Sequence, residues 1–213
     1  MSGNFTKVVV GDFEYEVSDG DLPNVLCMVA HVLNENLQHV RTICLWRGEF
    51  GSAPPFDIGP DTLFVAYSAW AEMTCFITLG WQFPEHIFDQ HTAYLAASNI
   101  LLPHNPDEKH KRPRKRLSDA CRAYGVAGWE HIDKETIAKD IGEGRWHLHG
   151  KDAVLDYCTE DALVYLLPSA FRMFCVGQIT VPSALRVFKP AVCQSTWHCG
   201  NWCRRTRGPS LPN

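Results

Sequence analysis

The sequence contains no apolar run that approaches the ~20 residues needed to cross a membrane. Its N-terminus lacks a basic stretch followed by an apolar segment, so no secretory signal is predicted. Positive charge is not in excess either, because 20 Lys and Arg residues stand against 24 Asp and Glu residues, a formal net charge of −4. These absences predict no membrane partner and exclude a general electrostatic attraction to nucleic acid.

A paired-cysteine framework is also missing. The chain has nine cysteines, an odd number, and several lie in segments with the composition of a protein core, namely Cys27, Cys44, Cys75 and Cys158. Buried free thiols in a reducing compartment fit this distribution better than disulfides do. At 213 residues, of which 46% are hydrophobic and 21% charged, the chain is long enough for one sizeable core and is not disordered overall.

What the sequence does contain is acidic residues in apolar surroundings. The stretch "VVVGDFEYEV" runs from three valines into Asp12, Phe13 and Glu14, and a β-branched run predicts a buried strand. Because strand side chains alternate, Asp12 and Glu14 project from one face about 7 Å apart, with Phe13 on the other. Such carboxylates repel each other unless the strand runs into solvent or a divalent cation lies between them.

The remaining pattern predicts strands first and helices afterwards, which is typical of an α/β or α+β fold. Short linkers rich in turn residues favour an antiparallel meander for the first three strands. Ser68 is a candidate N-cap and Gly80 a candidate C-terminal stop for the first helix. The expected strands are 5–13, 25–32, 40–46 and 63–67, and the expected helices are 69–79 and roughly 90–100, 116–124, 133–141 and 150–167.

Two further acids lie on the apolar faces of predicted helices. Glu72 lies on the inward face of the first helix, and Asp161 lies on that of the last. Tyr157 is four residues before Asp161, so the two side chains lie one above the other, and Cys158 belongs to the same seam. A buried lone carboxylate costs several kcal/mol unless it is paired or binds a metal.

Together with Asp12 and Glu14, these residues have the composition of a two-metal phosphoryl-transfer site. Two Mg²⁺ or Mn²⁺ ions about 4 Å apart would hold the scissile phosphate, activate a water and stabilise the leaving 3′ oxygen. The candidate metal ligands are therefore Asp12, Glu14, Glu72 and Asp161. The hydroxyl of Tyr157 can orient the attacking water without titrating near pH 7.

The motifs "DFE" in the first strand, "LFVAYSAWAE" at the next strand-to-helix junction and "YCTED" in the last helix occur in the order found in a known family. Over about residues 5–170 the chain resembles the DEDD superfamily of 3′–5′ exonucleases, tyrosine subclass. It is most similar to the proofreading domain of family A, phage-type DNA polymerases and to RNase D. The resemblance implies an RNase H-like α/β fold, a mixed five-stranded sheet with flanking helices, over 1–178, followed by an irregular tail over 179–213.

The resemblance also implies roles for the site residues. Asp12 would bridge both metal ions, Glu14 and Asp161 would complete the inner site, and Tyr157 would hold the nucleophilic water. Glu72 stands where the family usually has Asp, and its extra methylene changes its reach.

Two neighbouring positions extend the comparison. The Tyr67–Ser68 pair stands where the family often has His-Asn. Asp89 matches a recurring acid with a structural or supporting role.

The implied activity is hydrolysis at the 3′ end of single-stranded DNA. The implied partners are a DNA polymerase domain, for which the sequence has no expected counterpart, or a primer–template. The implied location is the cytoplasm of a bacterium, for a bacterial or phage-encoded protein. An RNase D-like RNA exonuclease and a catalytically impaired nucleic-acid-binding domain remain the alternatives.

One basic run stands out against the acidic chain. "KHKRPRKR" holds six Lys and Arg residues within eight positions, and it is either a solvated loop or a nucleic-acid contact. The candidate binding residues are Lys109, Lys111, Arg112, Arg114, Lys115 and Arg116.

Other clusters are weaker metal candidates. Cys193, His198, Cys199 and Cys203 lack the two paired C-x₂₋₄-C knuckles of a structural zinc site. His147 and His149 are expected in a surface loop.

Overall fold

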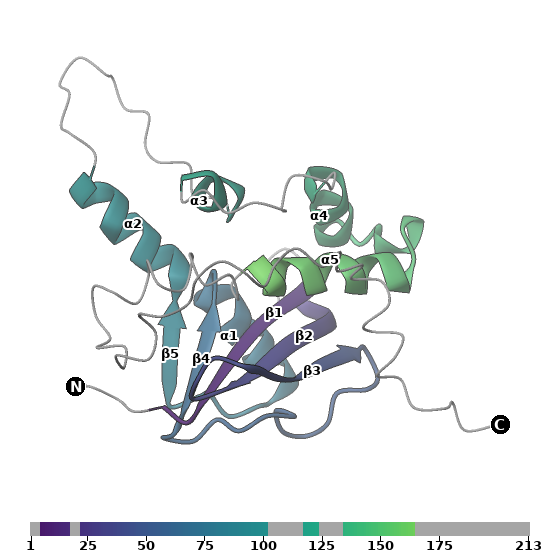
Figure 1. Ribbon diagram of the computed structural model, residues 1–213. Coiled ribbons are helices and arrows are strands. Elements are labelled where there is room, and N and C mark those ends of the chain that lie inside the picture. The colour runs from purple at the N-terminus through teal and green to yellow at the C-terminus, as the bar shows by residue number, and fades with distance from the viewer. Residues whose placement is uncertain (1–4, 18–21, 102–116, 124–133, 165–213) are drawn as a thin grey trace, which may run out of the picture.

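The computed structural model describes residues 5–17, 22–101, 117–123 and 134–164. These residues form a five-stranded mixed sheet with helices on both faces (Figure 1), so the predicted α/β class and its RNase H-like arrangement are confirmed. No helix within the described ranges is both long and apolar enough to cross a membrane.

The sheet has the strand order β3-β2-β1-β4-β5. Strands β1 (Lys7–Glu16), β2 (Asn24–Asn34) and β3 (His39–Trp46) form the predicted antiparallel meander. Strands β4 (Thr62–Ala66) and β5 (His86–Asp89) extend the sheet on the other side of β1 by parallel pairing. The central strand β1 is therefore flanked by one antiparallel and one parallel neighbour.

Helices cover the two faces of this sheet unequally. Helix α1 (Ala69–Leu79) packs against one face, where Phe13, Phe64 and Phe76 form an aromatic core. Helix α5 (Lys151–Val164) crosses the other face over β1 and β2 (Figure 1). The remaining elements are α2 (Gln90–Leu101), α3 (Leu117–Ala123), α4 (Lys134–Gly142) and the short 3₁₀ helix η1 (Trp146–Leu148).

Strand β1 is longer than the sequence predicts. The expected end at residue 13 is wrong, because β1 continues to Glu16 by pairing with β2, including Tyr15 with Val25 after a register shift. Its parallel pairing with β4 stops earlier, at Val10 opposite Val65. The last residues of β1 thus have β2 on one side and no strand partner on the β4 side, which leaves their backbone accessible to helices.

Gly11 allows an unusually close approach within this strand. A Cβ atom at Gly11 would lie 2.8 Å from Cε2 of Phe64, whose ring is completely buried. A side chain there would have to displace the aromatic core on the α1 face. Glycine therefore lets β1 lie flat on Phe64 immediately before its first acid, Asp12.

The ends of α1 follow the prediction only in part. Gly80 adopts the left-handed conformation, with φ of 67°, at the predicted C-terminus. Ser68 precedes the helix as predicted, but its side chain makes no capping hydrogen bond. The carboxylate of Asp89 accepts the hydrogen bond from the Ala69 N–H instead, at 3.0 Å.

Candidate metal centre

Asp12 and Glu14 lie on the α5 face of β1, as strand alternation predicts. They pair across the ladder with Val29 and Cys27, whose side chains belong to the core under α5. Phe13, between them, points to the opposite face and contacts the rings of Phe76 and Trp81. The two carboxylates therefore lie inside the fold, at the carboxyl end of the central strand, and not in a strand end running into solvent.

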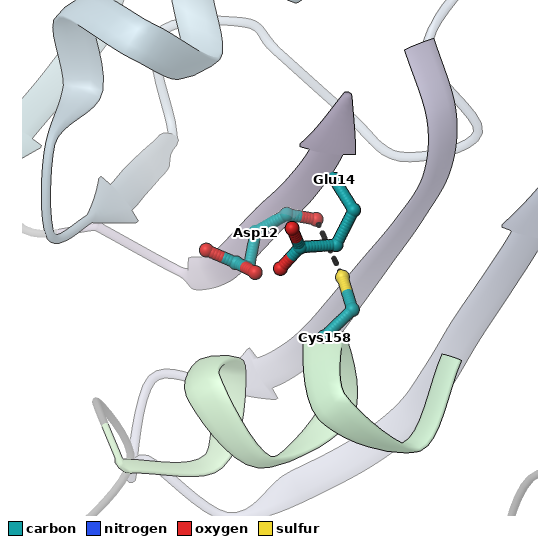
Figure 2. A group of neighbouring side chains, drawn as sticks. All are labelled: Asp12, Glu14 and Cys158. Atoms are coloured by element: carbon teal, nitrogen blue, oxygen red, sulfur yellow. Dashed lines mark hydrogen bonds between the residues drawn. The ribbon is translucent and has the colours of Figure 1, made fainter. Parts of the chain in front are cut away.

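Helix α5 brings a thiol to these two acids (Figure 2). The Sγ of Cys158 donates a hydrogen bond to the backbone oxygen of Asp12, at 3.3 Å. One ligand atom each from Asp12, Glu14 and Cys158 lie within 4.8 Å of one another. Among the described residues this is the one group of three His, Cys, Asp or Glu side chains with that spacing, so it is the candidate metal centre.

The same helix adds the predicted Tyr157 and Asp161. Their side chains are joined by a hydrogen bond, which the phenol O–H donates to the carboxylate. Burial raises the pKa of Tyr157 well above its ordinary value, and the charges of Asp161, Glu14 and Asp12 raise it further. Tyr157 therefore keeps its proton at neutral pH, and its oxygen can still accept a hydrogen bond from a water.

Glu72 reaches the cluster from α1. Its side chain is 5% exposed, and its carboxylate accepts a hydrogen bond from the backbone N–H of Phe13, on the edge of β1 that β4 leaves open. Its Oε2 atom is buried without a hydrogen-bond partner. Buried polar atoms are nearly always paired, so an unpartnered carboxylate oxygen beside other acids marks a place for a cation.

Burial and mutual repulsion raise the pKa values of the two glutamates. For Glu14 burial acts first, followed by the charges of Asp12, Cys27, Asp161 and Glu72, and all of them raise its pKa well above the ordinary value. For Glu72 burial again acts first, followed by Asp12, which raises its pKa, whereas the N–H of Phe13 lowers it. The principal neighbours of both groups are acids and a thiol, so a bound divalent cation would relieve this repulsion.

The structure thus brings the four predicted acids close enough to interact by charge, but only two of them belong to the group of three candidate ligands. Asp12 and Glu14 belong to the group of three, whereas Glu72 and Asp161 act on it by charge and are outside that group. Cys158 was not predicted as a ligand, although its position on the seam of Tyr157 and Asp161 was visible in the sequence. Its position next to Tyr157 could have identified it, because Tyr157 and Cys158 pack in the same part of the core.

Asp89 has a structural role. Its Oδ2 accepts the hydrogen bond from Ala69 N–H, and its Oδ1 accepts one from Thr92 N–H at 2.7 Å. One carboxylate therefore caps the N-termini of both α1 and α2, and it fixes the start of the helix that carries Glu72.

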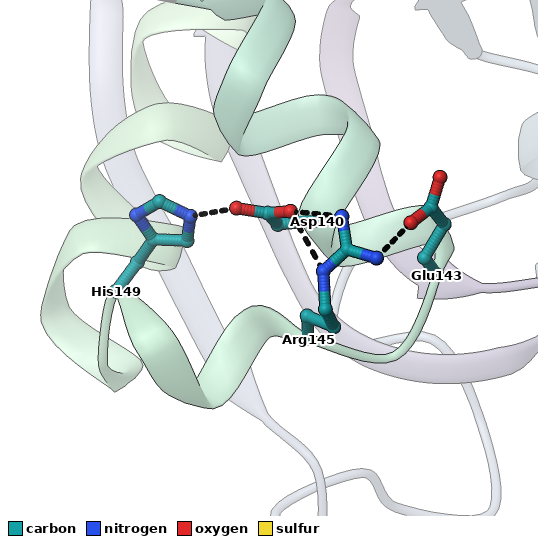
Figure 3. A network of polar contacts seen from close by, with 4 residues as sticks. All are labelled: Asp140, Glu143, Arg145 and His149. Carbon is teal, nitrogen blue, oxygen red and sulfur yellow. Dashed lines mark hydrogen bonds and ion pairs between the residues drawn. The ribbon is translucent and has the colours of Figure 1, made fainter.

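A separate polar network anchors the start of α5 (Figure 3). Asp140 accepts hydrogen bonds from Arg145 Nε at 3.0 Å and from His149 Nε2 at 2.8 Å, and Arg145 also pairs with Glu143. The bonds from His149 and Arg145 hold the pKa of Asp140 below its usual range. His149 is therefore committed to Asp140, and neither it nor the exposed His147 joins the metal centre.

The aromatic residue of η1 connects this network to β1. The Nε1–H of Trp146 donates to Glu16 Oε1 at 2.7 Å, and the ring packs on Trp46 with 5.3 Å between centroids. Arg47 lies 5.1 Å above the Trp146 ring. These contacts hold the end of β1 against the segment that leads into α5, so the acids and Cys158 are positioned from both sides.

Some predicted residues lie outside the described residues. These are the basic run Lys109–Arg116, the tail residues Cys193, His198, Cys199 and Cys203, and the domain boundary at 178. The prediction of buried free thiols is confirmed for Cys27, Cys75 and Cys158, whereas Cys44 is only partly buried.

No family model, no curated protein and no solved structure matches this chain. The functional conclusion therefore rests on the residues and geometry of the metal centre alone.

Proposed function

We propose that this protein is a metal-dependent 3′–5′ exonuclease that hydrolyses phosphodiester bonds at the end of a single-stranded nucleic acid, DNA being the expected substrate. The observation that carries the proposal is the convergence of four acids and one tyrosine from β1, α1 and α5. Few other reactions require so many carboxylates in one place. No basic group is among the principal neighbours of Glu14 and Glu72, so the negative charge of these acids is not balanced by the protein's own side chains.

The residues fit divalent cations. Among the acids, Asp12 has the strongest effect on both Glu14 and Glu72, so it would be the ligand shared by both ions of a two-metal site. Glu14, Asp161 and the unpartnered oxygen of Glu72 would supply the remaining protein ligands. Bound Mg²⁺ or Mn²⁺ would supply activation of a water and stabilisation of charge on the scissile phosphate.

The protein's own groups would orient the water that attacks. The O–H of Tyr157 is engaged by Asp161, so the phenol oxygen presents its lone pairs to a water proton. Its raised pKa keeps it neutral, and a neutral phenol adds no repulsion toward the phosphate. Glu14 and Asp161 are only partly buried, so a substrate end would approach the cluster from their side.

Cleavage of a 5′-labelled single-stranded oligonucleotide tests the proposal. We expect a ladder of products shortened from the 3′ end with Mg²⁺ or Mn²⁺ and no products in EDTA. Asp12→Asn should lose nearly all activity because one carboxylate would serve both ions. Asp152→Asn, which changes an exposed acid near the start of α5, should cleave like the parent.

Two outcomes would contradict the proposal. Full activity in chelator would exclude the metal mechanism, and equal activity of Asp12→Asn and the parent would exclude this site. Metal binding without cleavage would indicate the catalytically impaired nucleic-acid-binding domain, and faster trimming of RNA than of DNA would indicate the RNA exonuclease.

A further inference from the structure

The donor set of the metal centre is chemically mixed. Asp12 and Glu14 offer hard carboxylate oxygens, but the third ligand atom within 4.8 Å is the sulfur of Cys158. Mg²⁺ sites are built from oxygen, whereas thiolate sulfur favours Zn²⁺ and other thiophilic ions. Cys158 is completely buried, and its thiol points from α5 toward β1, beside Glu14 and the Asp12 backbone oxygen (Figure 2).

A second, independent observation indicates that a cation belongs here. Glu72 is 95% buried, that is, 5% exposed, and its Oε2 has no hydrogen-bond partner. The Phe13 N–H holds this carboxylate against β1 between Asp12 and Glu14, and Asp12 is the charge that acts on it most strongly. A buried carboxylate oxygen without a hydrogen-bond partner therefore belongs to a side chain that interacts electrostatically with both acids of the group that Cys158 completes.

We propose that Asp12, Glu14 and Cys158 form a mixed carboxylate–thiolate site that binds a thiophilic divalent cation of the Zn²⁺ class. The inference rests on the proposed function in one respect, namely that the same two carboxylates hold a metal. On binding, the Sγ–H bond of Cys158 breaks, a sulfur–metal bond forms and the proton passes to water.

The geometry of such a site follows from the preferences of zinc. Zn²⁺ with three protein ligands usually keeps a fourth, tetrahedral position for water or substrate. The hydrogen bond from Cys158 to the Asp12 backbone oxygen would be lost, and that oxygen would have to find another donor. Removal of the sulfur should therefore weaken Zn²⁺ binding while leaving an oxygen site that still suits Mn²⁺.

Cobalt substitution tests this ligand set. The full chain is used with Cys175, Cys193, Cys199 and Cys203 replaced by Ser, because these residues are alternative thiol ligands outside the described part of the chain. One equivalent of Co²⁺ should give a near-ultraviolet sulfur-to-cobalt charge-transfer band that Zn²⁺ abolishes and excess Mg²⁺ does not.

The variants identify the sulfur. Cys158→Ser and Asp12→Asn should lose the band, whereas Cys27→Ser, a matched buried thiol beside Cys158, should keep it. Cys158→Ser should also reduce Zn²⁺ affinity at least about tenfold while Mn²⁺ affinity changes little. A band that survives in Cys158→Ser, or no band in the parent, overturns the proposal.

Two controls keep the result clear. If Cys158→Ser fails to fold by circular dichroism, X-ray absorption of the zinc-loaded parent should show sulfur at about 2.3 Å, and oxygen alone at the shorter distance would overturn the proposal. Metal-dependent cleavage without a sulfur band would refute this inference and leave the exonuclease proposal standing. A sulfur band without cleavage would support the mixed carboxylate–thiolate site and refute the exonuclease proposal.

Discussion

Glu72 reaches the metal centre from α1, whose core lies on the face of the sheet opposite to Asp12 and Glu14. It does so where β4 ends and the backbone of β1 is open, and its carboxylate accepts the Phe13 N–H there. Its position therefore combines a structural contact, which any acceptor could make, with a buried carboxylate whose charge a bound cation would stabilise.

Replacing Glu72 by Gln separates these two roles. The amide keeps the shape and an acceptor for Phe13 N–H, but it removes the repulsion with Asp12. In chelator we expect the free energy of unfolding of Glu72→Gln to exceed that of the parent by about 1 kcal/mol. This difference should raise the unfolding temperature by about 2–4 °C. Its affinity for Mn²⁺ should fall about 10-fold or more.

Thermal unfolding and Mn²⁺ titration followed by electron paramagnetic resonance measure the two effects. Glu85→Gln, an exposed acid, serves as the control and should change neither quantity. A Glu72→Gln variant that is less stable in chelator and binds Mn²⁺ normally would show that the carboxylate is only a structural acceptor.

At the scale of elements, much of the architecture was predictable because periodicity depends on local sequence. The alternation of strand residues correctly placed Asp12 and Glu14 together. Helical spacing correctly placed Tyr157 and Cys158 in the core under α5, whereas Asp161 is only partly buried. The class, the antiparallel meander and the glycine stop of α1 were also predicted.

The parts that were missed depend on contacts between distant segments. Glu14, Tyr15 and Glu16 alternate as strand residues do, but the local sequence does not fix where the strand ends, and only the pairing with β2 extends β1 to Glu16. The capping of α1 was assigned to Ser68 by proximity, whereas Asp89 supplies it from the next strand. Cys158 became a candidate ligand only once α5 was seen to cross β1.

The double cap at Asp89 gives a prediction at this scale. Asp89→Ala removes acceptors from the first turns of both α1 and α2, and we expect it to lower the free energy of unfolding by about 2 kcal/mol, at about 1 kcal/mol per cap. Urea unfolding followed by circular dichroism measures the change.

Two variants define the contribution of the caps. Asp89→Asn retains one acceptor oxygen and should recover part of the loss, whereas Asp61→Ala, at an exposed position, should have little effect. Equal stability of Asp89→Ala and the parent would mean that water replaces both hydrogen bonds at no cost.

The stability of the whole molecule should depend on pH through His31. This side chain is 3% exposed, and burial, followed by the neighbouring His39, lowers its pKa from 6.5 to about 4. Its Nδ1 lies 2.8 Å from the hydroxyl of Thr42. Between pH 6.5 and pH 4 the unfolded chain binds a proton at His31 that the folded chain does not, so the free energy of unfolding falls as the pH falls.

The expected loss attributable to His31 is up to about 3 kcal/mol between pH 6.5 and pH 4. His31→Gln should have a lower stability that changes less over this interval, and the difference between the two pH dependences isolates the histidine from the titrating acids. Urea unfolding at a series of pH values measures it. Parallel pH dependences in the two proteins would show that His31 titrates normally in the fold.

The proposed binding of nucleic acid needs a local source of positive charge, because the net charge of the chain, −4, provides no attraction of its own. We expect the basic run to supply it, since each phosphate contact adds a salt-dependent term to binding. Replacing Lys111, Arg112, Arg114 and Lys115 by Ser should weaken single-stranded DNA binding and flatten the dependence of log K on log salt. Cleavage of saturating substrate should change little.

Fluorescence anisotropy at several salt concentrations provides the measurement. As a control, Lys7→Ser removes one exposed lysine of the described sheet, which pairs with Asp57, and should leave the salt dependence unchanged. An unchanged slope in the quadruple variant would identify the run as a solvated loop.

The separation of the cluster residues along the chain has a consequence for biosynthesis. Asp12 is made early, Glu72 follows from α1, and the thiol of Cys158 arrives only with the last described helix. A nascent chain would carry the first acids in a sheet that cannot yet enclose them, and it would gain the complete centre when α5 closes over β1. Because a domain generally folds as a unit, the proposed nucleolytic competence would be acquired in a single late step, once α5 has left the ribosome.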